Sequence, residues 1–207
     1  MSFLKTFLPQ VFIEFVQHIL AMRSWKRGGY LDNAPQGIKE SVFHKYGITN
    51  AAWVETGTYL GTTTKFLCRN FPHVYTIEPG LDLYQTACAR FSGMNVTLFN
   101  GVSENILPEL LPTLSGNINF WLDGHYSAGV TFKGGKDCPV EDELSAIEKS
   151  LSNFDKLTIL IDDVRCFLPS NSAYSADYPS IDYLVDWARK LNMRWRIEHD
   201  IFIMQRD

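Results

Sequence analysis

Five short segments of the chain are polar, glycine-containing or acidic, and each lies at the end of a run of apolar residues. The segments are residues 55–61, Glu78, residues 100–104, residues 123–126 and residues 162–163. Groups of these types bind nucleotides, hold cations and move protons. If the apolar runs are parallel strands, all five segments meet at the carboxyl edge of one sheet, where open α/β sheets bind ligands. We therefore predict one composite site along that edge.

The first segment has the features of a turn that binds an anionic or nucleotide ligand. Gly57 and Gly61 allow a tight turn and close approach of a ligand to the backbone. The helix expected after them offers free N–H groups, and Thr62 and Thr63 add hydroxyl donors. Glu78 follows Gly57 by 21 residues, the spacing at which a carboxylate at a strand end reaches a ribose diol. An ordinary strand–helix connection would also explain the glycines, but not this spacing.

Three aspartates follow two apolar runs that we expect to be neighbouring strands. Asp123 follows the first run, and Asp162 and Asp163 follow the second. Carboxylates at this range repel one another, which raises a pKa unless a cation neutralises them. A set of oxygen ligands suits Mg²⁺. The alternative is internal compensation, in which Asp162 caps the next turn and Asp163 pairs with Arg165.

Apolar runs alternate with segments of helical period from residue 50 onward. The expected strands are residues 51–55, 74–78, 96–99, 118–122 and 157–161, with a closing hairpin at 195–205. The expected helices are residues 63–69, 82–91, 105–111, 139–151 and 181–191. This alternation predicts an α/β fold, a Rossmann-like, doubly wound, mostly parallel seven-stranded sheet with an antiparallel C-terminal strand.

Composition excludes several classes of protein. With 45% hydrophobic and 20% charged residues among 207, the chain can bury a core and is neither disordered nor fibrous. A net charge of −4 without a Lys/Arg block predicts no nucleic-acid partner. The four cysteines form no CxxC pair, which indicates free thiols and a reducing, cytoplasmic location. The sequence contains no run of 18 uncharged apolar residues, so no membrane-spanning helix is predicted.

The apolar-rich residues 3–22 are interpreted as an amphipathic helix, because Glu14, Gln17 and His18 interrupt the run. This helix would pack on the domain, form a homo-oligomer contact or touch a membrane surface.

The motifs together resemble class I S-adenosylmethionine-dependent methyltransferases. Residues 55–63 resemble their first motif in its catechol O-methyltransferase form, residues 75–78 the second, and residues 96–108 the third. The resemblance implies that Glu78 binds the ribose and that Ser103 and Glu104 flank the adenine, although the catechol enzymes carry an amide at the latter position. The complete predicted cofactor-binding set is Glu55, Gly57, Thr58, Tyr59, Gly61, Thr62, Thr63, Glu78, Gly101, Ser103, Glu104 and Asp123.

The acidic segments carry a resemblance of their own. Residues 160–164 resemble the metal motif of the catechol enzymes, and residues 123–125 with 162–163 are similar to macrocin-type sugar O-methyltransferases. That similarity implies Asp123, Asp162 and Asp163 as metal ligands and His125 as the general base. A histidine with an ordinary pKa near roughly 6.5 suits proton removal at neutral pH. His125 could instead be only a metal-shell or loop residue.

Further stretches, including residues 34–39, 120–131, 138–144 and 177–181, resemble uncharacterised bacterial methyltransferase-like proteins. The sequence thus predicts an N-terminal helical extension or cap at residues 1–48 and an S-adenosylmethionine-dependent methyltransferase domain at 49–207. We expect loops 127–137 and 168–180 to form the acceptor side, and residues 27–38 to cover the cofactor.

The predicted function is Mg²⁺-dependent O-methylation of a small-molecule or sugar hydroxyl. A nucleotide-binding oxidoreductase of the NAD type is one alternative, although the third glycine of the dinucleotide pattern is missing. A non-catalytic S-adenosylmethionine-binding module is the other.

Overall fold

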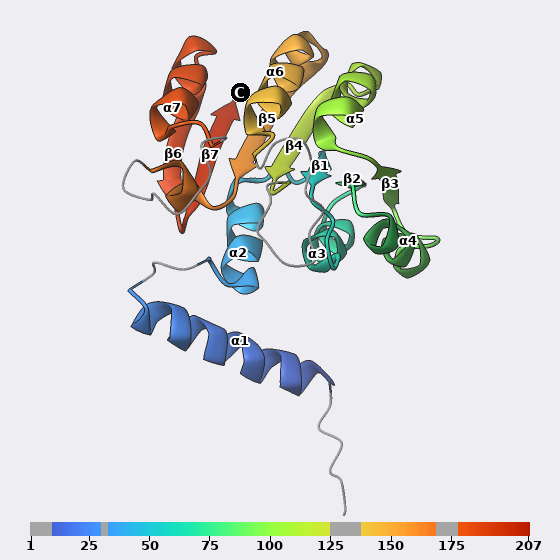
Figure 1. Cartoon of the computed structure of the whole chain (residues 1–207), viewed down its shortest axis with the longest axis vertical. Helices are drawn as coiled ribbons and strands as arrows, with labels where there is room; N and C mark the ends of the chain where they lie inside the picture. Colours follow the sequence, from blue (N-terminus) through green and yellow to red (C-terminus); the bar gives the residue numbers. More distant parts are fainter. Residues whose placement is uncertain (1–9, 30–32, 125–137, 169–177) are drawn as a thin grey trace, which may run out of the picture.

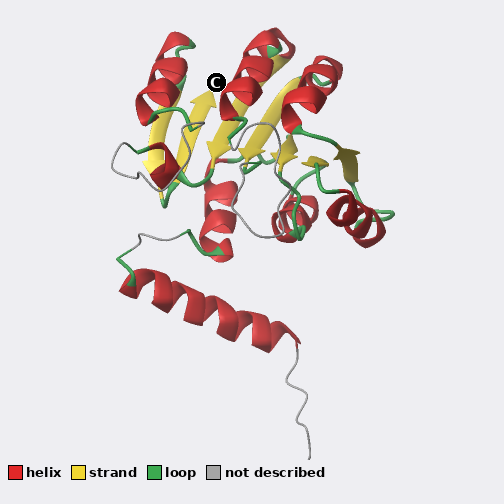
Figure 2. Ribbon diagram, viewed as in Figure 1, coloured by secondary structure: helices red, strands yellow, loops and turns green. Residues whose placement is uncertain are grey.

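A computed structural model describes the chain apart from residues 1–9, 30–32, 125–137 and 169–177. A central sheet lies between two layers of helices (Figures 1 and 2). The strands are β1 (Ala52–Thr56), β2 (Val74–Glu78), β3 (Val96–Asn100), β4 (Gly116–Leu122), β5 (Phe154–Ile161), β6 (Arg194–Glu198) and β7 (Ile201–Arg206). The helices are α1 (Gln10–Arg27), α2 (Gln36–Tyr46), α3 (Thr62–Asn70), α4 (Leu81–Arg90), α5 (Ser103–Leu110), α6 (Val140–Lys149) and α7 (Ile181–Lys190).

The sheet has seven strands in the order β3-β2-β1-β4-β5-β7-β6. Strands β1 to β5 pair in parallel, and β7 runs antiparallel to both β5 and β6. This arrangement confirms the predicted fold class, including the antiparallel C-terminal strand. The strand order reverses between β1 and β4, and open α/β sheets bind their ligands at the carboxyl ends of strands at such a reversal.

Strand register aligns the segments that the sequence singled out. Thr56 pairs with Leu122, and Leu122 with Ile161. The residues that follow these three strand ends, Gly57, Asp123 and Asp162, therefore begin side by side at one edge of the sheet.

Each face of the sheet buries its own hydrophobic cluster. Helices α5, α6 and α7 cover one face, where Leu107, Leu144 and Leu184 are fully buried. Helices α2, α3 and α4 cover the other. Phe43 of α2 packs edge-on against Trp53 of β1 and Trp121 of β4, with ring centroids 5.3 and 4.8 Å apart. Helix α2 is thus part of the core, although the sequence predicted no helix at its position and placed residues 1–48 in an N-terminal extension or cap.

Helix α1 lies beside this body rather than within it (Figure 1). Trp25 is its one buried side chain among those described, and its ring packs edge-on against His199 at 5.7 Å. Val16 and Leu20 are exposed. None of the helices in the described part of the chain is long and apolar enough to cross a membrane.

Candidate functional site

The turn after β1 packs tightly against the end of β4, and this contact requires glycine. Gly57 has a φ of +85°, and a Cβ atom built there would lie 2.5 Å from the carbonyl oxygen of Asp123. The backbone N–H of Asp123 in turn donates to the carbonyl of Thr56 at 3.2 Å. The first predicted segment and the first predicted aspartate therefore meet at the strand-order reversal.

Glu78 ends β2 and holds the turn through its carboxylate. One oxygen accepts a hydrogen bond from the backbone N–H of Tyr59 at 2.7 Å, and the other from the N–H of Gly80 at 2.8 Å. Tyr59 adopts a left-handed conformation with φ 47°, and the Glu78 side chain is buried. A carboxylate has about four lone-pair sites, so two backbone donors leave acceptor capacity for the hydroxyls of a ligand.

Glu55 lies behind the turn in a buried cluster of hydroxyls. Its carboxylate accepts hydrogen bonds from Thr64 at 2.5 Å and from Thr76 at 2.7 Å, and Thr58 shares a 2.6 Å hydrogen bond with Thr76. Complete burial raises the pKa of Glu55 to about 8, although the two hydroxyl hydrogen bonds oppose the shift. Within the described structure, Glu55 and Thr58 thus support the turn from inside.

The remaining predicted cofactor residues lie around this turn and at the end of β3. Gly61 precedes α3 with φ +68°, and the Thr63 hydroxyl donates to the side-chain carbonyl of Gln36 at 3.4 Å. The Gly101 N–H donates to the carbonyl of Glu78 at 3.2 Å. Thr62 is exposed at the start of α3. Ser103 is buried at the start of α5, and Glu104 lines a groove of about 300 Å³ between α5 and α6.

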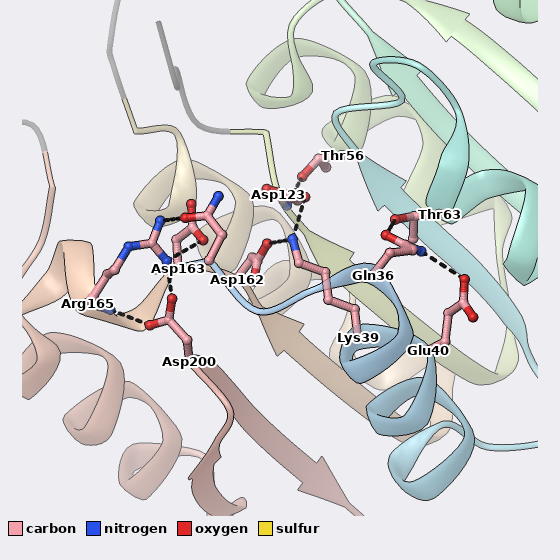
Figure 3. Close-up of polar contacts among 11 residues, drawn as sticks. Gln36, Lys39, Glu40, Thr56, Thr63, Asp123, Asp162, Asp163, Arg165 and Asp200 are labelled. Atoms are coloured by element: carbon pink, nitrogen blue, oxygen red, sulfur yellow. Dashed lines mark hydrogen bonds and ion pairs between the residues drawn. The ribbon is translucent and has the colours of Figure 1, made fainter. Parts of the chain in front are cut away.

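Lys39 of α2 reaches the two aspartates at the ends of β4 and β5 (Figure 3). Its ammonium forms an ion pair with Asp162 and lies 3.8 Å from the Asp123 carboxylate. The same nitrogen is 5.4 Å from the ring centroid of Trp121, within the range of a cation–π contact. Helical period explains why the Lys39 side chain points toward the sheet. Lys39 lies four residues before the core residue Phe43 and therefore on the same face of the helix.

Opposing effects act on the pKa values of this pair. Burial raises the pKa of Asp162 and Asp123 raises it further, whereas the Lys39 ammonium lowers it. Burial alone would lower the pKa of Lys39, but Asp123 and Asp162 together outweigh it and hold that pKa above its usual value. Lys39 is therefore charged at neutral pH.

Asp163 is held by a different cation. Its carboxylate forms an ion pair with Arg165 at 2.8 Å, and Arg165 also forms an ion pair with Asp200 and a hydrogen bond with Asn33. Figure 3 shows Arg165 between Asp163 and Asp200. The sequence offered this pairing of Asp163 with Arg165 as the alternative to a metal.

The described structure thus divides the three aspartates that the sequence assigned to one ion. In that part of the chain, no group of three histidine, cysteine, aspartate or glutamate side chains could hold a metal ion. His125, loop 127–137 and most of loop 168–180 lie outside the described residues. Sequence reasoning missed Lys39 as a partner of Asp162, because nothing local to residue 39 indicates a contact 123 positions away.

Comparison with known proteins identifies the fold but no family. No protein-family model matches the chain, and no curated protein matches it. A candidate methyltransferase from Streptococcus mutans, solved with S-adenosylhomocysteine, is 16% identical with a TM-score of 0.50, covering 84% of this chain and 97% of its own. An S-adenosylmethionine-dependent methyltransferase from Aquifex aeolicus is 15% identical with a TM-score of 0.50, covering 80% of this chain and 87% of its own.

A third solved structure with this fold is the 23S rRNA methyltransferase ErmE. It is 10% identical with a TM-score of 0.51, and the match covers 84% of this chain and 68% of that one. The chain therefore has the fold of S-adenosylmethionine-dependent methyltransferases. These likenesses do not single out the catechol or macrocin types.

Proposed function

We propose that this protein binds S-adenosylmethionine at the carboxyl ends of β1 to β3 and transfers its methyl group to an acceptor near the ends of β4 and β5. The proposal rests mainly on the position of the Glu78 carboxylate, which is buried and bonded to the turn after β1. This buried carboxylate lies at the end of β2, where it accepts one hydrogen bond from the Tyr59 N–H of the glycine turn and another from the N–H of Gly80. A carboxylate at this position of a methyltransferase fold suits the ribose hydroxyls of the cofactor.

The other predicted residues complete the proposed cofactor site. Gly57, Tyr59 and Thr63 would hold the methionine end, where the turn and the first N–H groups of α3 meet. Ser103 and Glu104 would flank the adenine at the start of α5. The methyl group would then face the edge where Asp123 and Asp162 lie, so that proximity to a held acceptor supplies much of the acceleration.

The finer assignment, O-methylation with His125 as general base and Mg²⁺ as cofactor, rests on sequence resemblance. His125 follows Asp123 by two residues in the sequence and lies outside the described residues. The Mg²⁺ part fits poorly, because the Lys39 ammonium already lies between Asp162 and Asp123. We therefore route no step of the proposed reaction through a metal ion.

A nucleic-acid acceptor is the second candidate, in place of a small-molecule hydroxyl. A groove of about 990 Å³ runs between α1, α2 and α3. The described part of its lining includes Lys65, Arg69 and Arg90, with Glu40 as the one acid among those residues. Thr62, at the start of α3, also lines it. Basic side chains that gather in a groove favour phosphate backbones, and ErmE, which shares the fold, is named as an rRNA methyltransferase.

Calorimetric titration with S-adenosylhomocysteine tests the proposed cofactor. The wild type should bind it and should melt at a higher temperature in its presence, because a ligand of the folded state stabilises that state. NAD(H) should do neither. Glu78→Gln should weaken binding roughly tenfold or more, since a hydrogen bond to a charged group contributes about 1.5–3 kcal/mol. The exposed Glu109 provides the matched control, and Glu109→Gln should bind as the wild type does.

Two results would remove the basis for this proposal. One is equal stabilisation by NAD(H), and the other is an S-adenosylhomocysteine affinity that Glu78→Gln leaves unchanged. Adding RNA and small phenols or sugars as acceptors, with detection of methyl transfer by mass spectrometry, would then separate the two acceptor classes.

A further inference from the structure

The carboxylates at the ends of β4 and β5 have cation partners that come from the chain itself. Lys39 serves Asp162 and Asp123, and Arg165 serves Asp163. Lys39 reaches the site from helix α2, whereas Arg165 lies two residues after Asp163 and also donates a hydrogen bond to the Asn33 side chain. The geometry therefore differs from an open ring of acids that awaits an ion.

Burial makes the Lys39 contact more than a surface ion pair. The Asp162 side chain is 1% exposed and that of Lys39 is 13% exposed. A buried carboxylate needs a cation or a proton, and here the ammonium is the group in contact. The ammonium therefore contacts three groups, because the aromatic face of Trp121 lies against it in addition to the two carboxylates.

We propose that Lys39 is the resident cation of this site and takes the place of a divalent metal ion. A divalent ion and the Lys39 ammonium cannot share the two carboxylates, because two cations at that separation repel each other strongly. The inference rests on the proposed function, since it specifies how the acceptor edge of that site is neutralised. Lys39 is a positioning residue, which fixes Asp123 and Asp162 beside the proposed methyl position.

Removal of Lys39 should open a metal site that the wild type lacks. Without the ammonium, Asp123 and Asp162 lose the cation that both of them contact, and oxygen ligands of this kind bind Mg²⁺ and Mn²⁺. Mn²⁺ is a convenient probe, because its free-ion electron paramagnetic resonance signal disappears on binding.

The experiment compares Mn²⁺ uptake by purified full-length variants, up to millimolar metal. The wild type and Lys39→Arg, which keeps a cation, should take up no Mn²⁺. Lys39→Ala should take up one ion, and so should Lys39→Met, which retains the apolar stem against Trp121 in case the alanine variant fails to fold. Asp162→Asn added to either should abolish the gain. The matched control is Lys45→Ala, on the same helix, which should behave as the wild type does.

Two outcomes would overturn the proposal. In the first, the wild type binds one Mn²⁺ and Asp162→Asn abolishes that binding, which would mean that Lys39 swings aside for a metal. In the second, folded Lys39→Ala and Lys39→Met both take up no ion, which would mean that the carboxylates do not form a cation position. Titration with S-adenosylhomocysteine in a chelator separates the two proposals, because failure to bind it would end the methyltransferase proposal while the Mn²⁺ comparison stays readable.

Discussion

The two halves of the carboxyl edge keep their buried acids in different ways. At the ends of β1 and β2, Glu78 is held by backbone N–H groups and Glu55 by threonine hydroxyls. At the ends of β4 and β5, Asp162 pairs with the ammonium of Lys39, which lies on helix α2, far away in the sequence but packed against the sheet. In the first half, N–H and hydroxyl dipoles stabilise the two carboxylates, and burial favours the protonated form of Glu55. In the second half, the positive charge of Lys39 stabilises Asp162.

This difference has consequences for stability and for ligands. Dipoles that belong to the turn are in place once the turn forms, and they leave room for a ligand's own hydroxyls. An ammonium from another element neutralises charge but must be brought in by packing, which here is supplied by Phe43 against Trp53 and Trp121. Substitutions at Lys39, Glu55 and Lys45 should separate backbone and hydroxyl dipoles from a full opposite charge, with effects on stability that decrease in that order.

Lys39→Ala should destabilise the protein by roughly 3–5 kcal/mol, because removing one partner of a buried ion pair leaves the other uncompensated. Urea unfolding at neutral pH would measure the loss. Asp162→Asn in the same chain should restore part of it, and the double-mutant cycle would isolate the pairwise interaction. Additive effects of the two substitutions would show that the two side chains contribute independently and would erase the contrast between the two halves of the edge.

Glu55 should make stability fall as the pH rises. The pKa is 4.5 in the reference state and about 8 in the fold, so the folded protein keeps a proton that the unfolded chain releases. The stabilisation is present below about 4.5 and is lost as the pH rises to the folded pKa, by at most about 1.4 kcal/mol per pH unit. Melting temperatures of wild type and Glu55→Gln between pH 5 and 8 would measure it, and the variant should show the weaker dependence. Identical slopes would mean that Glu55 is ionised in the fold.

Lys45→Ala should change stability least. Lys45 lies on the same helix as Lys39 and pairs with Glu198 at 2.8 Å, but its side chain is 56% exposed. Exposed pairs of this kind contribute little because water and salt screen them. The melting temperature of the variant should equal that of the wild type within the error of measurement, both at low salt and at high salt. A loss comparable to that of Lys39→Ala would show that burial does not distinguish the two lysines.

Most of the fold could be predicted because its signals are local. Strands such as Val74–Glu78 and Ile201–Arg206 are apolar runs bounded by turn residues, and the helix Ile181–Lys190 has a regular apolar face. Alternation along the chain then dictates a parallel sheet. Within the N-terminal extension the sequence predicted a helix only in residues 3–22. Helix Gln36–Tyr46 was missed because its buried residues, Val42, Phe43 and Tyr46, lie only in its second half and give a short apolar pattern.

The contacts at the ends of β1 and β2 could be predicted better from the sequence than those at the ends of β4 and β5. The contacts of Glu78 join residues 19 and 2 positions apart, so spacing along one strand–helix–strand unit was informative. The Lys39–Asp162 pair spans 123 positions and the Arg165–Asn33 contact spans 132. Such contacts depend on how helix α2 packs on the finished sheet, and one sequence carries no spacing rule for that.

The order of synthesis determines when the contact between Lys39 and Asp162 can form. A nascent chain emerges from the ribosome with its N-terminal end first, so Lys39 leaves the exit tunnel long before Asp162, which follows it by 123 residues. Until then, Lys39 has no Asp162 to pair with, and Phe43 has no Trp121 of strand β4 to pack against. The ion pair at the ends of β4 and β5 therefore forms only late in translation, after the residues of the Gly57–Gly61 turn and of strands β1 to β3 have left the ribosome.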